Sequence, residues 1–134
     1  MKKFLVAFFC LAVFACNDNK NEYEKPENAL DAGRSFIEHS LRGQFSTAKR
    51  YMIADKENLY WLEKVSTDYN RLSEKDKNGF SNSSIKINEV ADVSDSITVI
   101  NYSNSYKNRA QKVKVVKHNG DWLVDFKYTF SGNL

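Results

Sequence analysis

QKVKVVKHNGDWLVDFKYTF, residues 111–130, is the stretch of this 134-residue sequence that decides the fold. Asn-Gly is the dipeptide that most favours a two-residue type I′ turn, and Asn119-Gly120 stands between two runs rich in β-branched and aromatic residues. The stretch therefore predicts a β-hairpin with antiparallel strands. With the turn at this position, His118 pairs with Asp121, and every pair further from the turn follows in the same register.

This register gives the last strand one aromatic face and one mixed face. The expected pairs are Lys117 with Trp122, Val115 with Val124, Lys114 with Asp125, Val113 with Phe126 and Gln111 with Tyr128. The aromatic face carries Trp122, Val124, Phe126, Tyr128 and Phe130, and the opposite face carries Leu123, Asp125, Lys127 and Thr129. A slip by one residue would turn the aromatic row to the wrong face. We interpret Lys114 and Asp125 as a solvated ion pair, which contributes about 0.2–1 kcal/mol.

Two further strands are expected before the hairpin. Ile85 and Ile87 alternate with polar residues, and residues 97–102 form a run rich in β-branched side chains. The polar segment from Asn101 to Asn108 predicts the loop that leads into the final hairpin. Together these segments predict four antiparallel strands.

Three helices are expected before the strands. Pro26 fits the first turn of the first helix and Gly43 supplies its stop. The apolar stripe between them consists of Leu30, Gly33, Ile37 and Leu41, flanked by Ala29 and Phe36. A short second helix covers residues 46–52. The third begins with Asp55 as its cap and becomes charged before it ends near Asn78-Gly79.

Helices followed by strands predict an α+β fold, in which N-terminal helices pack on a curved antiparallel sheet of about four strands. From Pro26 to about Phe126 the chain resembles the nuclear transport factor 2-like, or cystatin-like, superfamily. It resembles more closely the small lipoproteins of unknown function that are often found in Bacteroidetes. The stretches that carry the resemblance are residues 29–37 (ALDAGRSFI), 43–52 (GQFSTAKRYM), 87–92 (INEVAD) and 119–125 (NGDWLVD).

The resemblance implies a cone-shaped fold in which the sheet and the first helix enclose a pocket. Members of the superfamily include isomerases, dehydratases and non-enzymatic binders, so the resemblance indicates a fold rather than an activity. Many members have an additional strand between their second and third helices, for which this sequence has no good candidate. Enzymes of the ketosteroid isomerase type need a carboxylate base and acidic hydrogen-bond donors in one apolar pocket, and no matching motif is present here.

The first sixteen residues have the parts of a bacterial secretory signal. Lys2 and Lys3 precede an unbroken apolar run from Phe4 to Ala15, which is followed by Cys16. The run of 12 residues is shorter than the ~20 that a transmembrane helix needs, so export is favoured over a permanent span. Val13-Phe14-Ala15-Cys16 resembles a lipobox, which implies that the cysteine thiol receives a diacylglycerol before cleavage in front of it.

An ordinary cleaved signal and an uncleaved anchor are the two alternatives for this region. With lipidation, the chain divides into a signal peptide over residues 1–15, a lipidated cysteine with a flexible polar tether over 16–25, and a single α+β domain over 26–134. Each buried methylene group contributes ~0.8 kcal/mol, so the acyl chains on Cys16 would hold the exported domain on a membrane of the cell envelope.

Composition excludes several classes of function. The formal net charge of +3 loses two lysines with the signal, and the nearly neutral remainder predicts no nucleic-acid partner. Cys10 leaves as well, so Cys16 is the one remaining cysteine, and neither an intramolecular disulfide nor a thiolate metal cluster can form. His39 and His118 stand far apart and do not make a zinc site. No phosphate-binding loop, nucleophile elbow or metalloprotease motif occurs, and no cofactor is indicated.

Six residues are candidates for lining a pocket, and none is assigned a catalytic role. They are Phe36, His39, Tyr102, Trp122, Phe126 and Tyr128. A histidine beside an apolar stripe can act as a base, but His39 is more simply interpreted as a surface or packing residue. The rings of Tyr102 and Tyr128 are expected mainly to pack in the core, with their hydroxyls available at a pocket mouth.

These features favour a non-catalytic domain that binds a small apolar ligand or a partner protein at the cell envelope. The first alternative is an enzyme of the isomerase or dehydratase type, with Asp125 or His39 and a tyrosine as its acid–base pair. The second is a structural or assembly role in which the sheet face or the charged third helix docks on another envelope protein. The residues that line the main cavity distinguish the binding domain from the enzyme, because acid–base catalysis needs a carboxylate or histidine that points into the cavity.

Overall fold

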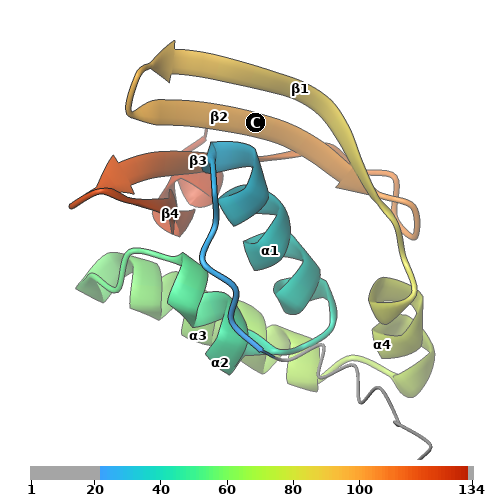
Figure 1. The fold of residues 1–134 in the computed structure, drawn as a ribbon. Coiled ribbons are helices and arrows are strands. Elements are labelled where there is room, and N and C mark those ends of the chain that lie inside the picture. Colours follow the sequence, from blue (N-terminus) through green and yellow to red (C-terminus); the bar gives the residue numbers. More distant parts are fainter. Residues whose placement is uncertain (1–21, 133–134) are drawn as a thin grey trace, which may run out of the picture.

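The computed structural model describes residues 22–132, and in this part of the chain four α-helices lie on one side of a four-stranded antiparallel sheet (Figure 1). The helices are α1 (Ala29–Leu41), α2 (Phe45–Ala48), α3 (Lys56–Asn70) and α4 (Glu74–Ser81), and the 3₁₀ turns are η1 (Lys49–Tyr51) and η2 (Phe126–Phe130). The strands, in their order in the sheet, are β1 (Ile85–Ser94), β2 (Ile97–Asn104), β3 (Gln111–His118) and β4 (Asp121–Asp125). The α+β class and the four antiparallel strands are confirmed.

Helix α1 lies directly under the sheet and forms the centre of the core (Figure 1). Phe36 and Ile37 are almost fully buried on its inner side. A Cβ atom at Gly33 would lie 2.5 Å from Ile100 Cδ1 of β2, so a side chain at this position would require the Ile100 side chain to shift. The glycine in the apolar stripe therefore lets Ile100 pack directly against the backbone of α1.

The two ends of α1 are set by local signals. Asn28 is the N-cap, and its side chain accepts a hydrogen bond from Asp31 N–H at 2.9 Å. Pro26 consequently lies before the cap and not in the first turn, so its predicted position is wrong. Gly43 has a φ of +71°, which glycine adopts without strain, and it ends the helix as predicted.

The final hairpin has the predicted register from its turn as far as Asp125, which lies opposite Lys114. Beyond Asp125 the chain leaves the sheet and forms η2, so the strand pairs predicted there are wrong. Those pairs are Val113 with Phe126 and Gln111 with Tyr128. The N–H of Lys127 donates to Asn58 Oδ1 of α3 at 2.7 Å, and this bond takes the place of a strand partner.

Two helical segments differ from the prediction. Residues 46–52 divide into α2 and η1 rather than forming one helix. The charged segment after Leu72 does not extend α3 but forms α4, whose N-cap Ser73 accepts a hydrogen bond from Asp76 N–H at 3.1 Å. A serine followed three residues later by an acidic residue is a helix-start signal that apolar spacing alone does not detect.

Two extended segments also differ from the prediction. Met52 forms a single parallel bridge with Val124, and Ile53 N–H donates to Val124 O at 2.9 Å. The chain between η1 and α3 therefore lies beside β4 through a single bridge, in a segment where the sequence offered no strand candidate. At the other end of the sheet, β2 continues to Asn104, so the first half of the loop predicted over residues 101–108 is strand.

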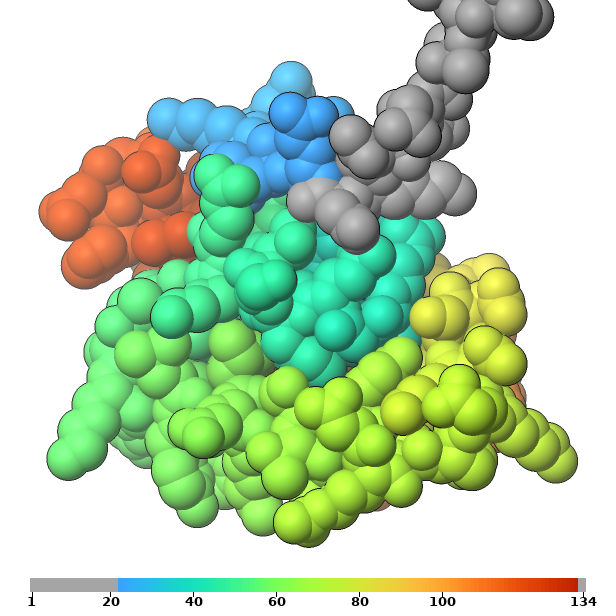
Figure 2. All heavy atoms as spheres, turned by 90° about the horizontal axis from the view of Figure 1, so that it is seen from below, coloured from blue at the N-terminus to red at the C-terminus, as the bar shows by residue number. Residues whose placement is uncertain are grey.

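Residues 23–25, which the sequence assigns to the tether, lie against the domain. The half-buried Tyr23 ring is 4.9 Å from the Tyr51 ring between centroids, and the Arg50 guanidinium stands 4.2 Å from the Tyr23 centroid. Lys25 pairs with Asp121 at 2.9 Å. In Figure 2 this N-terminal segment is the blue surface beside α1, α2 and η1. The predicted signal peptide, Cys16 and the rest of the tether lie outside the described residues.

Candidate functional site

An apolar cleft of about 300 Å³ lies between the helices and the end of the sheet that holds Tyr102 of β2 and Gln111 of β3. Its walls come from α1, the start of α2, the C-terminal half of α3, Phe80 of α4, and the ends of β2, β3 and η2. The lining residues are Phe36, Ile37, Ser40, Leu41, Phe45, Val65, Asp68, Tyr69, Leu72, Phe80, Tyr102, Gln111, Phe126, Thr129 and Phe130. This volume is at the lower end of the range for small-molecule sites, and apolar walls with few polar groups are typical of them.

Aromatic rings in contact with one another form one wall of the cleft. Phe126 meets Phe36 edge to face at 4.8 Å and Phe130 at 5.1 Å between ring centroids. Phe130 in turn stacks on Trp61 of α3 at 4.0 Å, with an angle of 5° between the planes. Each edge-to-face or stacked pair contributes about 0.5–1.5 kcal/mol beyond its area burial, so this wall is stiff before any ligand arrives.

The polar side chains of the cleft are few, and three of them donate hydrogen bonds within the domain: Ser40, Tyr102 and Thr129. Tyr102 Oη donates a hydrogen bond to Gln111 Oε1 at 3.0 Å, and burial raises the pKa of the Tyr102 phenol well above its ordinary value. The phenol therefore stays neutral at physiological pH. Asp68 is the one carboxylate among the lining residues; it is exposed and lies 4.0 Å from the Arg71 guanidinium. No histidine lines the cleft.

The structure brings together three of the six candidate pocket residues. Phe36, Tyr102 and Phe126 line the apolar cleft. Trp122 lines a different and more polar groove beside the N-terminus of α1. The sequence predicted that all four could line one pocket, but in the structure they line two separate hollows.

His39 and Tyr128 have other contacts. His39 is buried, its ring stacks on Tyr51 at 5.7 Å, and its Nδ1 donates to Gln44 Oε1 at 2.7 Å. His39 is therefore a packing residue, one of the two roles that the sequence analysis favoured over a catalytic base. Tyr128 lies in η2 with its ring centroid 5.4 Å from Lys114 Nζ.

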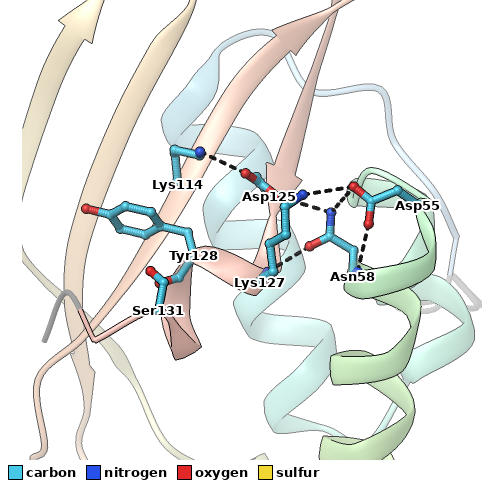
Figure 3. A network of polar contacts seen from close by, with 7 residues as sticks. All are labelled: Asp55, Asn58, Lys114, Asp125, Lys127, Tyr128 and Ser131. Carbon is cyan, nitrogen blue, oxygen red and sulfur yellow. Dashed lines mark hydrogen bonds and ion pairs between the residues drawn. The ribbon is translucent and has the colours of Figure 1, made fainter.

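The ion pair of Lys114 with Asp125 forms as predicted, at 2.8 Å, but its expected solvation is wrong. Asp125 is only 6% exposed, and Lys127 Nζ also contacts it at 2.7 Å. Figure 3 shows the carboxylate between the two lysines, with Asn58 and Asp55 of α3 closing the group. The chain turns into η2 just after Asp125. The N-terminal end of α3 then covers the Asp125 side chain, which a longer β4 would have left exposed to solvent.

Asn58 is the residue of this network that sequence analysis missed. It is fully buried, and its Nδ2 donates to Asp125 Oδ1 and to Asp55 Oδ2, each at 3.1 Å. Its Oδ1 accepts from Lys127 N–H. An asparagine in the first turn of a helix normally faces water, and its local sequence carries no signal of burial. Only the packing of α3 against β4 and η2 gives it these partners.

The charges of the network stabilise one another. Burial by itself raises the pKa of Asp125, but hydrogen bonds from Lys114, Lys127 and Asn58 outweigh it and leave the pKa below its ordinary value. Hydrogen bonds to Asp125 and Asp55 raise the pKa of Lys127. The backbone N–H of Asn58, followed by Lys127, lowers the pKa of Asp55. Asp125, Asp55 and Lys127 are thus held ionised, and Lys114 is paired with Asp125, which suits a structural role better than proton transfer.

Within residues 22–132 no cluster of three or more histidine, cysteine or acidic side chains could hold a metal ion. None of the helices in the same range is both long enough and apolar enough to cross a membrane.

Comparisons of the chain with models of protein families, with curated proteins and with solved structures find no match.

Proposed function

We propose that this chain is a lipid-anchored protein of the bacterial cell envelope whose nuclear transport factor 2-like domain binds a small apolar ligand without catalysis. The observation that carries the proposal is the apolar cleft, with aromatic and aliphatic walls and with hydroxyl groups already engaged in hydrogen bonds. Burial of apolar surface contributes about 25 cal/mol per Å², so an apolar molecule is the ligand that such walls favour.

Two features support the superfamily assignment. Helix α1 lies under a curved antiparallel sheet with the cleft beside it, as expected for a cone formed by a first helix and a sheet (Figure 1). The bridge of Met52 with Val124 stands where many members of the superfamily have their additional strand. The proposal of a cone therefore rests on the position of α1 and on this bridge together with the sequence resemblance.

The residues of the enzyme alternative are engaged elsewhere, which favours binding over catalysis. Asp125 accepts from two lysines and from Asn58. His39 packs on Tyr51 outside the residues that line the cleft. A general base has to reach the substrate, and in the cleft the one carboxylate is the exposed Asp68.

The anchor is proposed from the signal and lipobox of the sequence. Because Tyr23 is held on the domain, Cys16 is seven residue steps from a fixed point, and these span at most ~25 Å when fully extended. Lipidation would then keep the domain close to the membrane surface. Cys16→Ser should release the protein from the membrane fraction, whereas an unmodified mass at the mature N-terminus would contradict lipidation.

Native mass spectrometry of the full chain purified from its own membrane tests the ligand. We expect an additional mass, beyond the lipid, that is lost on mild activation. Val65→Phe should abolish it, because Val65 lines the cleft and a phenyl ring there occupies the space of the ligand.

Val93→Phe is the matched control, since Val93 lies on β1 and is 65% exposed. It should retain the ligand. Equal retention by both variants would show that the additional mass binds elsewhere, and no retained mass in any form would count against a ligand-binding role.

A further inference from the structure

We infer that the cleft takes a neutral ligand with an apolar body of about ten non-hydrogen atoms and one oxygen that accepts a hydrogen bond from the side-chain amide of Gln111. This inference rests on the proposed function and names the chemical class of its ligand. Three features of the cleft support it: its hydrogen-bond donors, its charge and its volume.

The first feature is that the hydroxyl protons inside the cleft are already donated. Ser40 and Thr129 donate theirs to backbone carbonyls at 2.7 Å. Tyr102 donates to Gln111 Oε1, and the Gln111 NH₂ group makes no hydrogen bond within residues 22–132. The remaining hydroxyl, that of Tyr69, stands at the loop between α1 and α2, where a Cβ atom on Gly43 would lie 3.1 Å from it.

Among the described residues that line the cleft, the Gln111 amide is therefore a side-chain donor open to a ligand, together with the Tyr69 hydroxyl near Gly43. Gln111 lies opposite Tyr102 at the first position of β3, so both side chains are on the helical face of the sheet. The bond from Tyr102 holds the Gln111 oxygen and thereby orients the NH₂ group away from it. A donor fixed in this way pairs with a carbonyl or ether oxygen, because those groups accept and do not donate.

The second feature is charge. Among the described residues that line the cleft there is no lysine, arginine or histidine, so a carboxylate or phosphate on the ligand would lose its hydration without gaining a cationic partner from them. Asp68 adds a negative charge at the rim and increases this penalty. It does not select a cation, because it is exposed to solvent and lies near Arg71.

The third feature is volume. The cleft volume of about 300 Å³ is at the lower end of the range for small-molecule sites, which suits a ligand with a body of about ten non-hydrogen atoms. One aromatic ring with a short carbonyl substituent fits this space, and it could stack or meet edge to face with the rings of Phe36, Phe126 and Phe130. A whole phospholipid does not fit.

Titration of the full chain carrying Cys16→Ser with four probes of similar size tests the inference. Acetophenone is neutral with a carbonyl oxygen, ethylbenzene is neutral without an acceptor, benzoate is an anion and benzylammonium is a cation. ¹⁵N-resolved NMR spectra report on the site directly, because the Gln111 side-chain amide has signals of its own. We expect acetophenone to shift these signals and to bind at least threefold more tightly than benzoate or benzylammonium.

Gln111→Glu is the decisive variant. It keeps an oxygen that accepts from Tyr102, but it removes the NH₂ donor and adds a negative charge. We expect the Kd of acetophenone to rise about 3- to 10-fold relative to that of ethylbenzene, and the preference to move toward benzylammonium. Asn101→Asp is the matched control, since Asn101 lies next to Tyr102 on the opposite face of β2 and its Oδ1 accepts from Asn88 at 3.1 Å.

An unchanged ratio of the two dissociation constants in Gln111→Glu would overturn the inference, as would tighter binding of either charged probe by the unmodified cleft. Both results would leave a ligand-binding cleft in place. Binding of none of the four probes would count against the proposed function as well. If Gln111→Glu does not fold, Gln111→Leu gives the same comparison of acetophenone with ethylbenzene and the same outcomes.

Discussion

The two ends of α3 face opposite kinds of interior. At its N-terminal end, Asp55 and Asn58 join a buried polar network in which the described donors and acceptors are paired (Figure 3). Its C-terminal half instead forms a wall of the apolar cleft through Val65 and Tyr69. One helix thus has one end bound by ionic hydrogen bonds and another end that leaves a hollow beside it.

This difference shows why the cleft, and not the polar network, is the candidate site. In the network, Asp125 already accepts from Asn58 and pairs with both lysines, so a ligand would have to replace bonds that are present. In the cleft, a ligand gains contacts with carbon surface that water wets poorly. Charged residues are therefore a poor guide to the site in this protein. The predictions that follow test the contrast from the largest expected effect to the smallest.

Asp125→Ala should be the most damaging change. It leaves Lys114 and Lys127 without their shared carboxylate, and removal of one partner from a buried pair costs about 3–5 kcal/mol. Because both lysines stay partly exposed, we expect the lower end of that range in urea denaturation. Asp121→Ala is the control, since it breaks an exposed pair with Lys25 and should cost much less stability than Asp125→Ala. Equal losses would mean that the network does not hold η2.

Gly79→Ala tests the helix that closes the cleft through Phe80. A Cβ atom at Gly79 would lie 2.4 Å from the Tyr106 ring, so the substitution should cost about 1–3 kcal/mol by displacing α4. In a Tyr106→Ala background the clash is gone, and the same change should instead stabilise by roughly 0.5–1 kcal/mol, because alanine favours a helix. A loss of the same size in both backgrounds would contradict the proposed contact. Thermal unfolding of the wild-type chain, the two single variants and the double variant measures these changes in stability.

Acid should weaken the network end of α3. The carboxyls of Asp125 and Asp55 have pKa values below their ordinary range, so their stabilising contribution is present above that range and is lost as the pH falls through the lowered values. We expect the free energy of unfolding to stay nearly constant between about pH 7 and pH 5 and to fall below about pH 4. Asp125→Asn should show a shallower fall, whereas an identical slope would exclude Asp125 as a source.

Val65→Phe should change stability least, by less than about 1 kcal/mol. The added ring enters a hollow rather than a filled core, where the same enlargement would cost about 1–3 kcal/mol. Urea denaturation of Val65→Phe and of Val93→Phe should give similar midpoints. A large loss in Val65→Phe alone would show that the cleft has no room for a ligand of the proposed size.

Much of the fold follows from short-range signals. Asn119-Gly120 predicts the turn and the register to Asp125, Asp55 predicts the start of α3, and Gly43 predicts the end of α1. Each of these signals acts within a few residues of the structure that it determines. The helix start at Ser73 is equally local and could have been predicted from its cap.

The candidate site follows less directly. Phe36, Tyr102 and Phe126 were predicted as pocket residues because they lie on apolar faces, and these three do line the cleft. The predicted pair of Gln111 with Tyr128 does not form, because β4 ends at Asp125, and the side of Gln111 toward β4 has no strand partner, while Tyr102 of β2 pairs with it on the other side. No pattern within β3 contains that information.

By itself the sequence determined the α+β class, the final hairpin as far as Asp125 and the apolar faces, since these depend on residues close together in the chain. Only the tertiary structure decided that β4 stops at Asp125 and that a hollow remains beside α1. Asn58 and Asp125 are 67 positions apart, and Lys127 and Asp55 are 72 apart. Whether such polar groups are buried and paired is a property of the packed elements together, and no local propensity encodes it.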